Sequence, residues 1–213
     1  MKAPAGLPHF TLEVGACEIA AIPDARLREL AAYWFARCPA PGAVPPRSAI
    51  DPLDFPDLLP NVMMVDCVAS HRAGDAVSDD GGLRYRFRLA GEAVTYAAGR
   101  RLAGHFLDEV LPEGYRDYVM LLNRVAIDQR RPVYSASLFH DEGNVVNGLT
   151  YRLVMPLYRP PDGAAHTQAD RAPNAIFVCQ FWQKRADGGW WDGDWLQIKP
   201  EIHVVAPPAF RWR

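Results

Sequence analysis

Five segments of the chain carry the side-chain patterns of β-strands. Each is short, rich in β-branched and aromatic residues, and bounded by glycine, proline or polar residues. They lie at residues 61–69, 83–89, 132–139, 149–158 and 175–183. The polar stretch HRAGDAVSDDGG at 71–82 separates the first two, so we expect these two segments to form a hairpin.

The second segment alternates strictly between basic and apolar residues. Arg84, Arg86 and Arg88 alternate with Tyr85, Phe87 and Leu89. Successive side chains of a strand point to opposite faces, so we expect the arginines to face solvent and the apolar side chains to face helices. The arginine face has two interpretations: an ordinary solvated face with acidic cross-strand neighbours, or a surface that contacts an acidic partner or ligand.

Helical periodicity occurs in two longer segments and two short ones. Residues 25–38 place apolar side chains on one face behind Asp24, which can cap the helix. Residues 115–131 carry a second apolar stripe, and short helical pieces are expected at 91–99 and 102–110. The pattern predicts an α+β fold, with a five-stranded antiparallel sheet, helices over one of its faces, an N-terminal helix and an aromatic-rich C-terminal tail.

Composition and charge narrow the classes of function. The chain has 213 residues, of which 49% are hydrophobic, and a formal net charge of −2. These values fit a chain with a sizeable core and argue against nucleic-acid binding driven by phosphate neutralisation. The four cysteines form no Cys-x-x-Cys pair, and no export signal or bilayer-length apolar run is present, so we expect a cytoplasmic protein without a membrane partner.

Motifs of nucleophilic catalysis and of phosphate loops are missing from the sequence. There is no Gly-x-Ser-x-Gly elbow and no glycine-rich loop of the nucleotide-binding type. We therefore expect no enzymatic activity and assign no catalytic residue. The sequence His140-Asp141-Glu142 has metal-ligand residue types, but adjacent residues on a turn rarely converge on one ion, so no metal site is expected.

Several short motifs follow one another in order over residues 25–184. They are Tyr33-Trp34 in the first helix, Arg47 ahead of Asp51-Pro52, Leu58-Leu59-Pro60 leading into a strand ending at Asp66, a second strand ending at Gly91, the spaced glycines Gly99 and Gly104, and Met155-Pro156-Leu157 in the fourth strand. In this order they resemble a bacterial family of PAS domains. The resemblance implies a five-stranded antiparallel sheet with helices over one face.

The resemblance also implies a sensory or regulatory role in signal transduction, through a small-molecule ligand, a partner protein, or both. The alternative is a ligand-free interaction domain that serves as a scaffold or dimerisation module. No output module is visible in the sequence, so a signalling partner protein is expected to receive the signal. The expected division is an extension at 1–24, the PAS-like domain at 25–184 and a tail at 185–213, with homodimerisation through the N-terminal helix, whose Trp34 and Phe35 stripe is broad.

The sequence leaves the cofactor unknown. The helical connector at residues 99–110 lacks the reactive cysteine of the flavin photosensors that this fold resembles, and the long helix at 115–131 has no histidine for haem. A ligand cavity between sheet and helices would be lined by residues from both layers. They are Tyr96, His105, Phe106, Val119, Leu122, Tyr134, Met155 and Phe181, with His105 as a polar contact. The alternative is that these side chains form a filled core.

Overall fold

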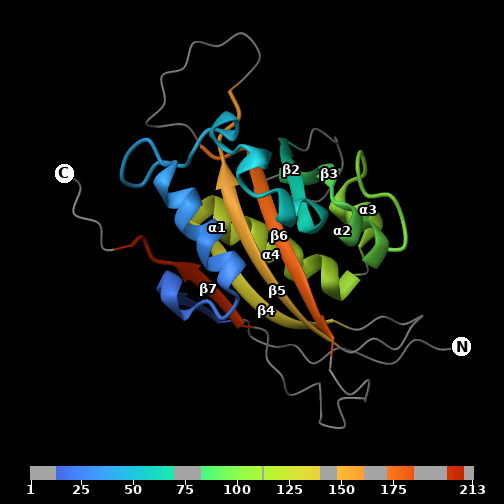
Figure 1. Cartoon of the computed structure of the whole chain (residues 1–213). Helices are drawn as coiled ribbons and strands as arrows, with labels where there is room; N and C mark the ends of the chain where they lie inside the picture. The colour runs from blue at the N-terminus through green and yellow to red at the C-terminus, as the bar shows by residue number, and fades with distance from the viewer. Residues whose placement is uncertain are drawn as a thin grey trace, which may run out of the picture.

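The five predicted strands lie in one sheet, which two further strands extend (Figure 1). The computed structural model describes residues 13–69, 83–111, 113–139, 148–160, 172–184 and 201–208. The strands are β1 (Val14–Cys17), β2 (Val62–Ala69), β3 (Leu83–Ala90), β4 (Val133–Phe139), β5 (Gly148–Leu157), β6 (Ala175–Lys184) and β7 (Glu201–Val205). The order across the sheet is β1-β7-β4-β5-β6-β2-β3.

The sheet has seven strands rather than the expected five, because both ends of the described chain add one. β7 pairs antiparallel with β4, and β1 pairs parallel with β7. The predicted β2–β3 hairpin is confirmed, and β5 pairs antiparallel with β4 and β6. Part of the segment assigned to a tail is therefore a strand of the main sheet. The predicted boundaries at residues 24 and 184 stay predictions.

Helices cover both faces of the sheet rather than one. They are α1 (Ala25–Ala36), α2 (Glu92–Ala97), α3 (Leu107–Val110) and α4 (Glu113–Gln129), with short 3₁₀ helices η1 (Ile19–Ala21), η2 (Arg47–Ala49), η3 (Pro52–Asp54) and η4 (Pro56–Asn61). Figure 1 shows α1 and α4 on opposite sides of the sheet. The reason lies in strands such as β5, where Leu153 and Met155 pack beneath α1 while Val154 packs beneath α4.

The N-terminal helix uses its apolar stripe to cover the sheet. Its buried residues are Leu27, Leu30, Ala31 and Trp34. Trp34 is 1% exposed and donates a hydrogen bond from Nε1 to the carbonyl of Pro156 in β5, 2.9 Å away. The stripe is thus engaged within its own chain. A homodimer through this helix stays a prediction that would have to use the opposite, more polar face.

The arginine strand β3 follows the predicted alternation except at its end. Tyr85 and Phe87 are buried in the core beneath the α2–α4 layer, as predicted. Leu89 was expected on the same side but is 50% exposed. A β-bulge between Met64 and Val65 shifts the register there, and such a shift moves the following side chains off their face.

Close backbone contact at Gly91 joins the end of β3 to η4. A Cβ atom built on Gly91 would collide with the carbonyl groups of Leu59 and Pro60. The Gly91 N–H also donates to the Val62 carbonyl at 2.8 Å. The absence of a side chain at Gly91 therefore lets η4 lie against the start of α2. The η4 residues at this contact are Leu59 and Pro60 of the Leu-Leu-Pro motif.

The described helices include none that is both long enough and apolar enough to cross a membrane. The four cysteines are free thiols, and burial raises the pKa of Cys38, Cys67 and Cys179 to about 12. Such thiols stay protonated near neutral pH and pack as small apolar side chains.

We expect Asp24→Ala to lower the free energy of unfolding by about 1 kcal/mol, the usual effect of losing an N-cap. The Asp24 carboxylate accepts hydrogen bonds from the backbone N–H groups of Arg26 and Leu27 at 2.9 and 3.3 Å. Partial burial alone would raise the pKa of Asp24, but these bonds and the Arg26 guanidinium together lower it. Because the folded pKa is below the unfolded one, this charge stabilises the protein above the unfolded pKa and stops doing so as the pH falls through the folded pKa. Urea unfolding at several pH values should therefore show that the difference in the free energy of unfolding between wild type and D24A becomes smaller as the pH falls. A difference that grows toward low pH would contradict this assignment.

Gly91→Ala should destabilise the protein more than Gly99→Ala does. The added methyl group at position 91 meets backbone atoms that cannot move independently, so we expect a loss of roughly 3 kcal/mol, as for a severe case of overpacking. Gly99 has φ +63° and open space around it, so Ala there should lose only about 1 kcal/mol from the left-handed backbone. Chemical denaturation of the two variants tests the ranking, and equal losses would mean that the η4 contact yields easily.

Candidate functional site

The predicted lining residues on the helical side are dispersed. Leu122 is fully buried between α4 and the sheet, and Val119 is half-buried against the same cluster. Phe106 is half-buried and His105 is exposed just before α3. Tyr96, on α2, exposes 88% of its surface. Of these five side chains, only Leu122 and Val119 contribute to the core beneath α4.

The predicted lining residues on the strands lie on the other face of the sheet. Tyr134, Met155 and Phe181 belong to the cluster that packs beneath α1. They cannot line one cavity with Leu122, because the sheet itself stands between them. The sequence did not reveal this, because successive side chains of each strand alternate between two faces and both sets include apolar residues, such as Val133, Val154 and Val178 in the other set. Either set could therefore have faced α4.

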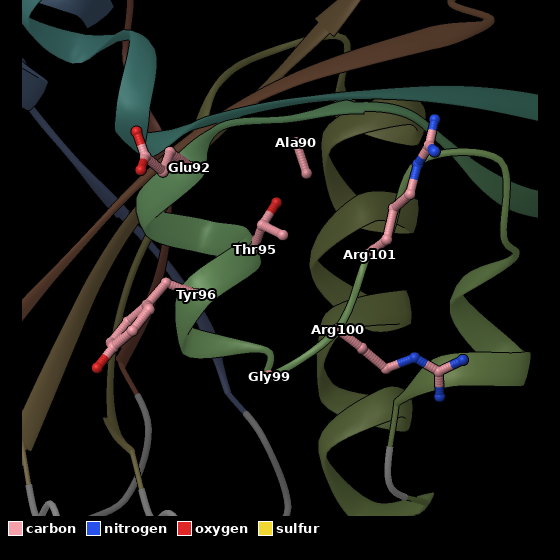
Figure 2. A pocket seen from close by; sticks show the side chains of 7 residues that line it. All are labelled: Ala90, Glu92, Thr95, Tyr96, Gly99, Arg100 and Arg101. Carbon is pink, nitrogen blue, oxygen red and sulfur yellow. The ribbon is translucent and has the colours of Figure 1, made fainter.

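A shallow open depression lies beside α2 (Figure 2). It is lined by Ala90, Glu92, Thr95, Tyr96, Gly99, Arg100 and Arg101. Figure 2 shows Glu92 and Tyr96 on one side of α2, and Arg100 and Arg101 on the chain beyond Gly99, so their polar groups do not converge. The depression therefore does not present a convergent set of polar groups to a ligand.

Polar side chains occupy the centre of the sheet beneath α4. Two adjacent rows cross β4, β5 and β6, with residues directly opposite one another in each row: Ser135–Arg152–Gln180 and Ser137–Thr150–Trp182. All are buried except Trp182, which is half-buried. They share the phase of Val154 and Val178, which pack in the core beneath α4. The polar rows therefore face α4 and not α1.

Arg152 is the centre of this buried polar layer. It is 2% exposed. Its Nε donates to Gln180 Oε1 at 2.7 Å, and its Nη2 donates to the hydroxyl of Tyr115 on α4, also at 2.7 Å. The guanidinium carbon lies 5.7 Å from the ring centroid of Tyr115 and 5.8 Å from that of Tyr118. The side chain thus bridges the sheet and α4 with neutral partners only.

Several polar atoms around Arg152 have no partner. They are Arg152 Nη1, Ser135 Oγ, Ser137 Oγ, Tyr118 Oη and Trp182 Nε1, which are all buried and make no hydrogen bond within the described part of the chain. The arginine and tryptophan nitrogens can only donate, while the hydroxyls can donate or accept. A buried polar atom without a partner costs about 1–3 kcal/mol, so five of them together mark an unusual environment.

The electrostatics of this layer favour a group that accepts hydrogen bonds. No carboxylate of the described residues pairs with Arg152. An unpaired buried cation is several kcal/mol less stable than one that is paired. A carboxylate fits the guanidinium fork and would accept from the neighbouring hydroxyl groups as well. A carboxylate or a comparable oxygen acceptor would therefore complement the charge and the free donors of this layer.

The sequence held a signal for this site that the strand pattern concealed. Arg152 and Gln180 each interrupt an otherwise apolar strand, in LTYRLVMPLY and AIFVCQFWQ. Long polar side chains are rarely fully buried without a partner, so such interruptions are informative. What the sequence could not supply was the register that sets the two side chains opposite each other.

No metal centre emerges from the described residues, which contain no group of three His, Cys, Asp or Glu side chains placed to hold an ion. His140, Asp141 and Glu142 lie outside the described residues. His105, the one polar residue predicted for the cavity, is exposed just before α3, and its backbone bonds to Phe87 and Leu102.

Comparison with known proteins gives one match. The family model described as a PAS domain matches residues 23–168, more than half of the chain. Searches of curated proteins and of solved structures return no match. The matched range includes α1, the β2–β3 hairpin, the helical connector, α4 and the strand that carries Arg152. PAS domains are in general sensory or interaction modules rather than catalysts, and this chain belongs to the PAS-domain family.

Proposed function

We propose that this PAS domain is a sensory domain for a small carboxylate-bearing molecule, held between the sheet and α4 with Arg152 as its anchor. The observation that carries the proposal is the buried Arg152 guanidinium, which has only neutral partners and one unused nitrogen. A ligand carboxylate would neutralise this cation and take up its free donor.

The surroundings of Arg152 support a small ligand rather than a macromolecule. The guanidinium is 2% exposed and the neighbouring serines are buried, so only a molecule enclosed between the layers reaches them. The aromatic rings of Tyr115 and Tyr118 would flank the apolar part of such a molecule. No enzymatic step is proposed.

The same contact offers a route from ligand to surface. Arg152 hydrogen-bonds both Gln180 in the sheet and Tyr115 on α4. A carboxylate that engages the guanidinium competes with the Tyr115 hydroxyl, and so favours positions of α4 that differ from those of the free protein. A ligand can shift such an equilibrium only by its difference in affinity for the two positions.

The proposal includes a signalling partner protein that responds to α4, and a cytoplasmic location. A homodimer through α1 is a further element of the proposal, to be checked by the mass of the protein in solution. The alternative function is a ligand-free interaction domain. The orphaned donors around Arg152 favour the ligand-binding version, because a permanently ligand-free core would gain stability by replacing them with apolar groups.

Arg152→Met should abolish ligand binding without unfolding the protein. We expect native mass spectrometry to detect a bound small molecule in the wild type, or a panel of small mono- and dicarboxylates to raise its melting temperature. R152M should show neither effect. Without ligand, R152M should stay folded, with a free energy of unfolding within about 3 kcal/mol of the wild type, because removal of a buried unpaired charge offsets the loss of its hydrogen bonds to Gln180 and Tyr115.

Arg124→Met is the matched control, since Arg124 lies on α4 in an exposed i,i+4 ion pair with Asp128. It should leave any carboxylate-induced shift unchanged. If R152M responds to carboxylates as the wild type does, Arg152 is not the anchor. If the wild type carries no ligand and responds to no member of the panel, the interaction-domain alternative replaces the proposal.

A further inference from the structure

A cluster of arginines lies on the face of the sheet opposite the Arg152 layer, at the β2–β3 end. Its centre is Asp66 of β2, which is 6% exposed. Asp66 Oδ2 lies 3.4 Å from Arg86 Nη2 and 3.8 Å from Arg88 Nη1, and Asp66 Oδ1 lies 3.8 Å from Arg159 Nη1. These ion pairs are long, and Asp66 Oδ1 makes no hydrogen bond within the described part of the chain.

The arginines come from three separate pieces of backbone: β3, the chain just beyond β5, and η2. Arg86 stands directly opposite Asp66 across the β2–β3 ladder, and Arg88 follows on the same strand. Arg159, just beyond β5, is fixed by Asn174, whose side chain accepts from the Arg159 N–H at 2.7 Å and donates to its carbonyl at 2.8 Å. The cluster is therefore held by the sheet and not by flexible loops alone.

Arg47 completes the cluster from η2. Its N–H donates to the carbonyl of Tyr158 at 2.7 Å, which places it beside the strand end that carries Arg159. Burial lowers the pKa of Arg47, and the positive charges of Arg88 and Arg159 lower it further, against the opposing effect of Asp66. Arg47 forms no ion pair with any described carboxylate.

The charges in this cluster do not balance. Three guanidinium groups, on Arg86, Arg88 and Arg159, face the single carboxylate of Asp66, and Arg47, whose backbone is bonded to Tyr158, adds a fourth positive charge nearby. This leaves an excess of three positive charges among the described residues. The side chains of Arg86, Arg88 and Arg159 are 45%, 39% and 35% exposed, so solvent and solutes reach them. Arg84, on the same strand, is different, because its guanidinium is paired with Asp108 and Glu109 at 2.7 and 3.0 Å.

From this arrangement we propose that Arg47, Arg86, Arg88 and Arg159 form a binding site for the phosphoryl group of a small phosphorylated molecule. Planar guanidinium groups match the oxygens of a phosphate in pairs. A phosphate monoester brings about two negative charges and three acceptor oxygens, and a diphosphate brings more, which suits an excess of three positive charges. A single carboxylate would leave most of that excess in place.

The site differs from the Arg152 layer in position and in chemistry. It lies on the side of the sheet that faces α1, with Asp66 in the phase of Val62 and Met64, and it opens to solvent. The proposal goes beyond the proposed function and does not rest on it. Asp66 acts as an internal counter-ion that gathers the arginines, and its carboxylate is expected to compete with the phosphate for them.

Isothermal titration calorimetry with inorganic pyrophosphate tests the proposal on the full chain. We expect saturable binding with one site, weaker binding of inorganic phosphate, and a decline with added salt, since these charges are partly exposed. Arg47→Gln and Arg159→Gln should each weaken pyrophosphate binding by about tenfold or more, which is the loss expected for a charge-assisted hydrogen bond. Asp66→Asn should strengthen binding, because the competing carboxylate is removed.

Two control variants separate this site from general charge effects. Arg84→Gln removes the same charge from the same strand but outside the cluster, so it should leave affinity unchanged; Arg152→Met should also leave it unchanged. Circular dichroism and thermal melts show that each variant is folded. Adenosine diphosphate and citrate distinguish the sources of negative charge: a phosphoryl site binds the nucleotide and prefers pyrophosphate to citrate. Absence of saturable pyrophosphate binding, equal weakening by R84Q and R47Q, or citrate binding as tight as pyrophosphate would each overturn the proposal.

Discussion

Burial of the sheet on both faces is the constraint on which the rest of the structure depends. Strands β5 and β6 carry buried apolar side chains on both faces of the sheet, so each face must be covered to remove those side chains from water. The α2–α4 layer covers one face, and α1 covers the other, where the Trp34 indole donates to a carbonyl of β5. The N-terminal helix is thus an integral layer of the domain, and the position of each charged side chain in the sheet follows from which layer lies above it.

Two charged residues of the sheet illustrate what this arrangement allows. Arg152 lies beneath α4, where it is enclosed and has only neutral partners. Asp66 lies on the other face, at the β2–β3 end, where its neighbours are the side chains of Arg86, Arg88 and Arg159. One site is enclosed and cationic, while the other is open and surrounded by cations. Their chemistry favours different ligands, a carboxylate inside and a phosphoryl group outside.

The motifs that resemble the PAS family gain physical reasons from the structure. Gly91 ends β3 because backbone carbonyls of Leu59 and Pro60 occupy the space of a side chain. Asp66 is the counter-ion of three arginines, and Arg47, ahead of the Asp-Pro pair, reaches the same cluster. Motif residues that are far apart in the sequence therefore meet at two places, one where η4 packs on β3 and one around Asp66. The family match over residues 23–168 spans both places.

The sequence by itself determined the elements: five strands, the capped helix α1, the longer helix α4 and the β2–β3 hairpin follow from local periodicity and turn residues. It could not determine which of the two alternating sets of side chains on a strand faces which helix. Tyr134, Met155 and Phe181 were therefore expected in one cavity with Leu122 of α4 but lie beneath α1. Nor could it supply β1 and β7, whose short segments become strands only by pairing with each other and with β4. The tertiary structure alone decided that Arg152 lies opposite Gln180, that Arg86, Arg88 and Arg159 meet at Asp66, and that Arg47 lies beside the strand end that carries Arg159. The reason is that register and long-range contact, unlike helix and strand propensity, depend on residues distant in the chain.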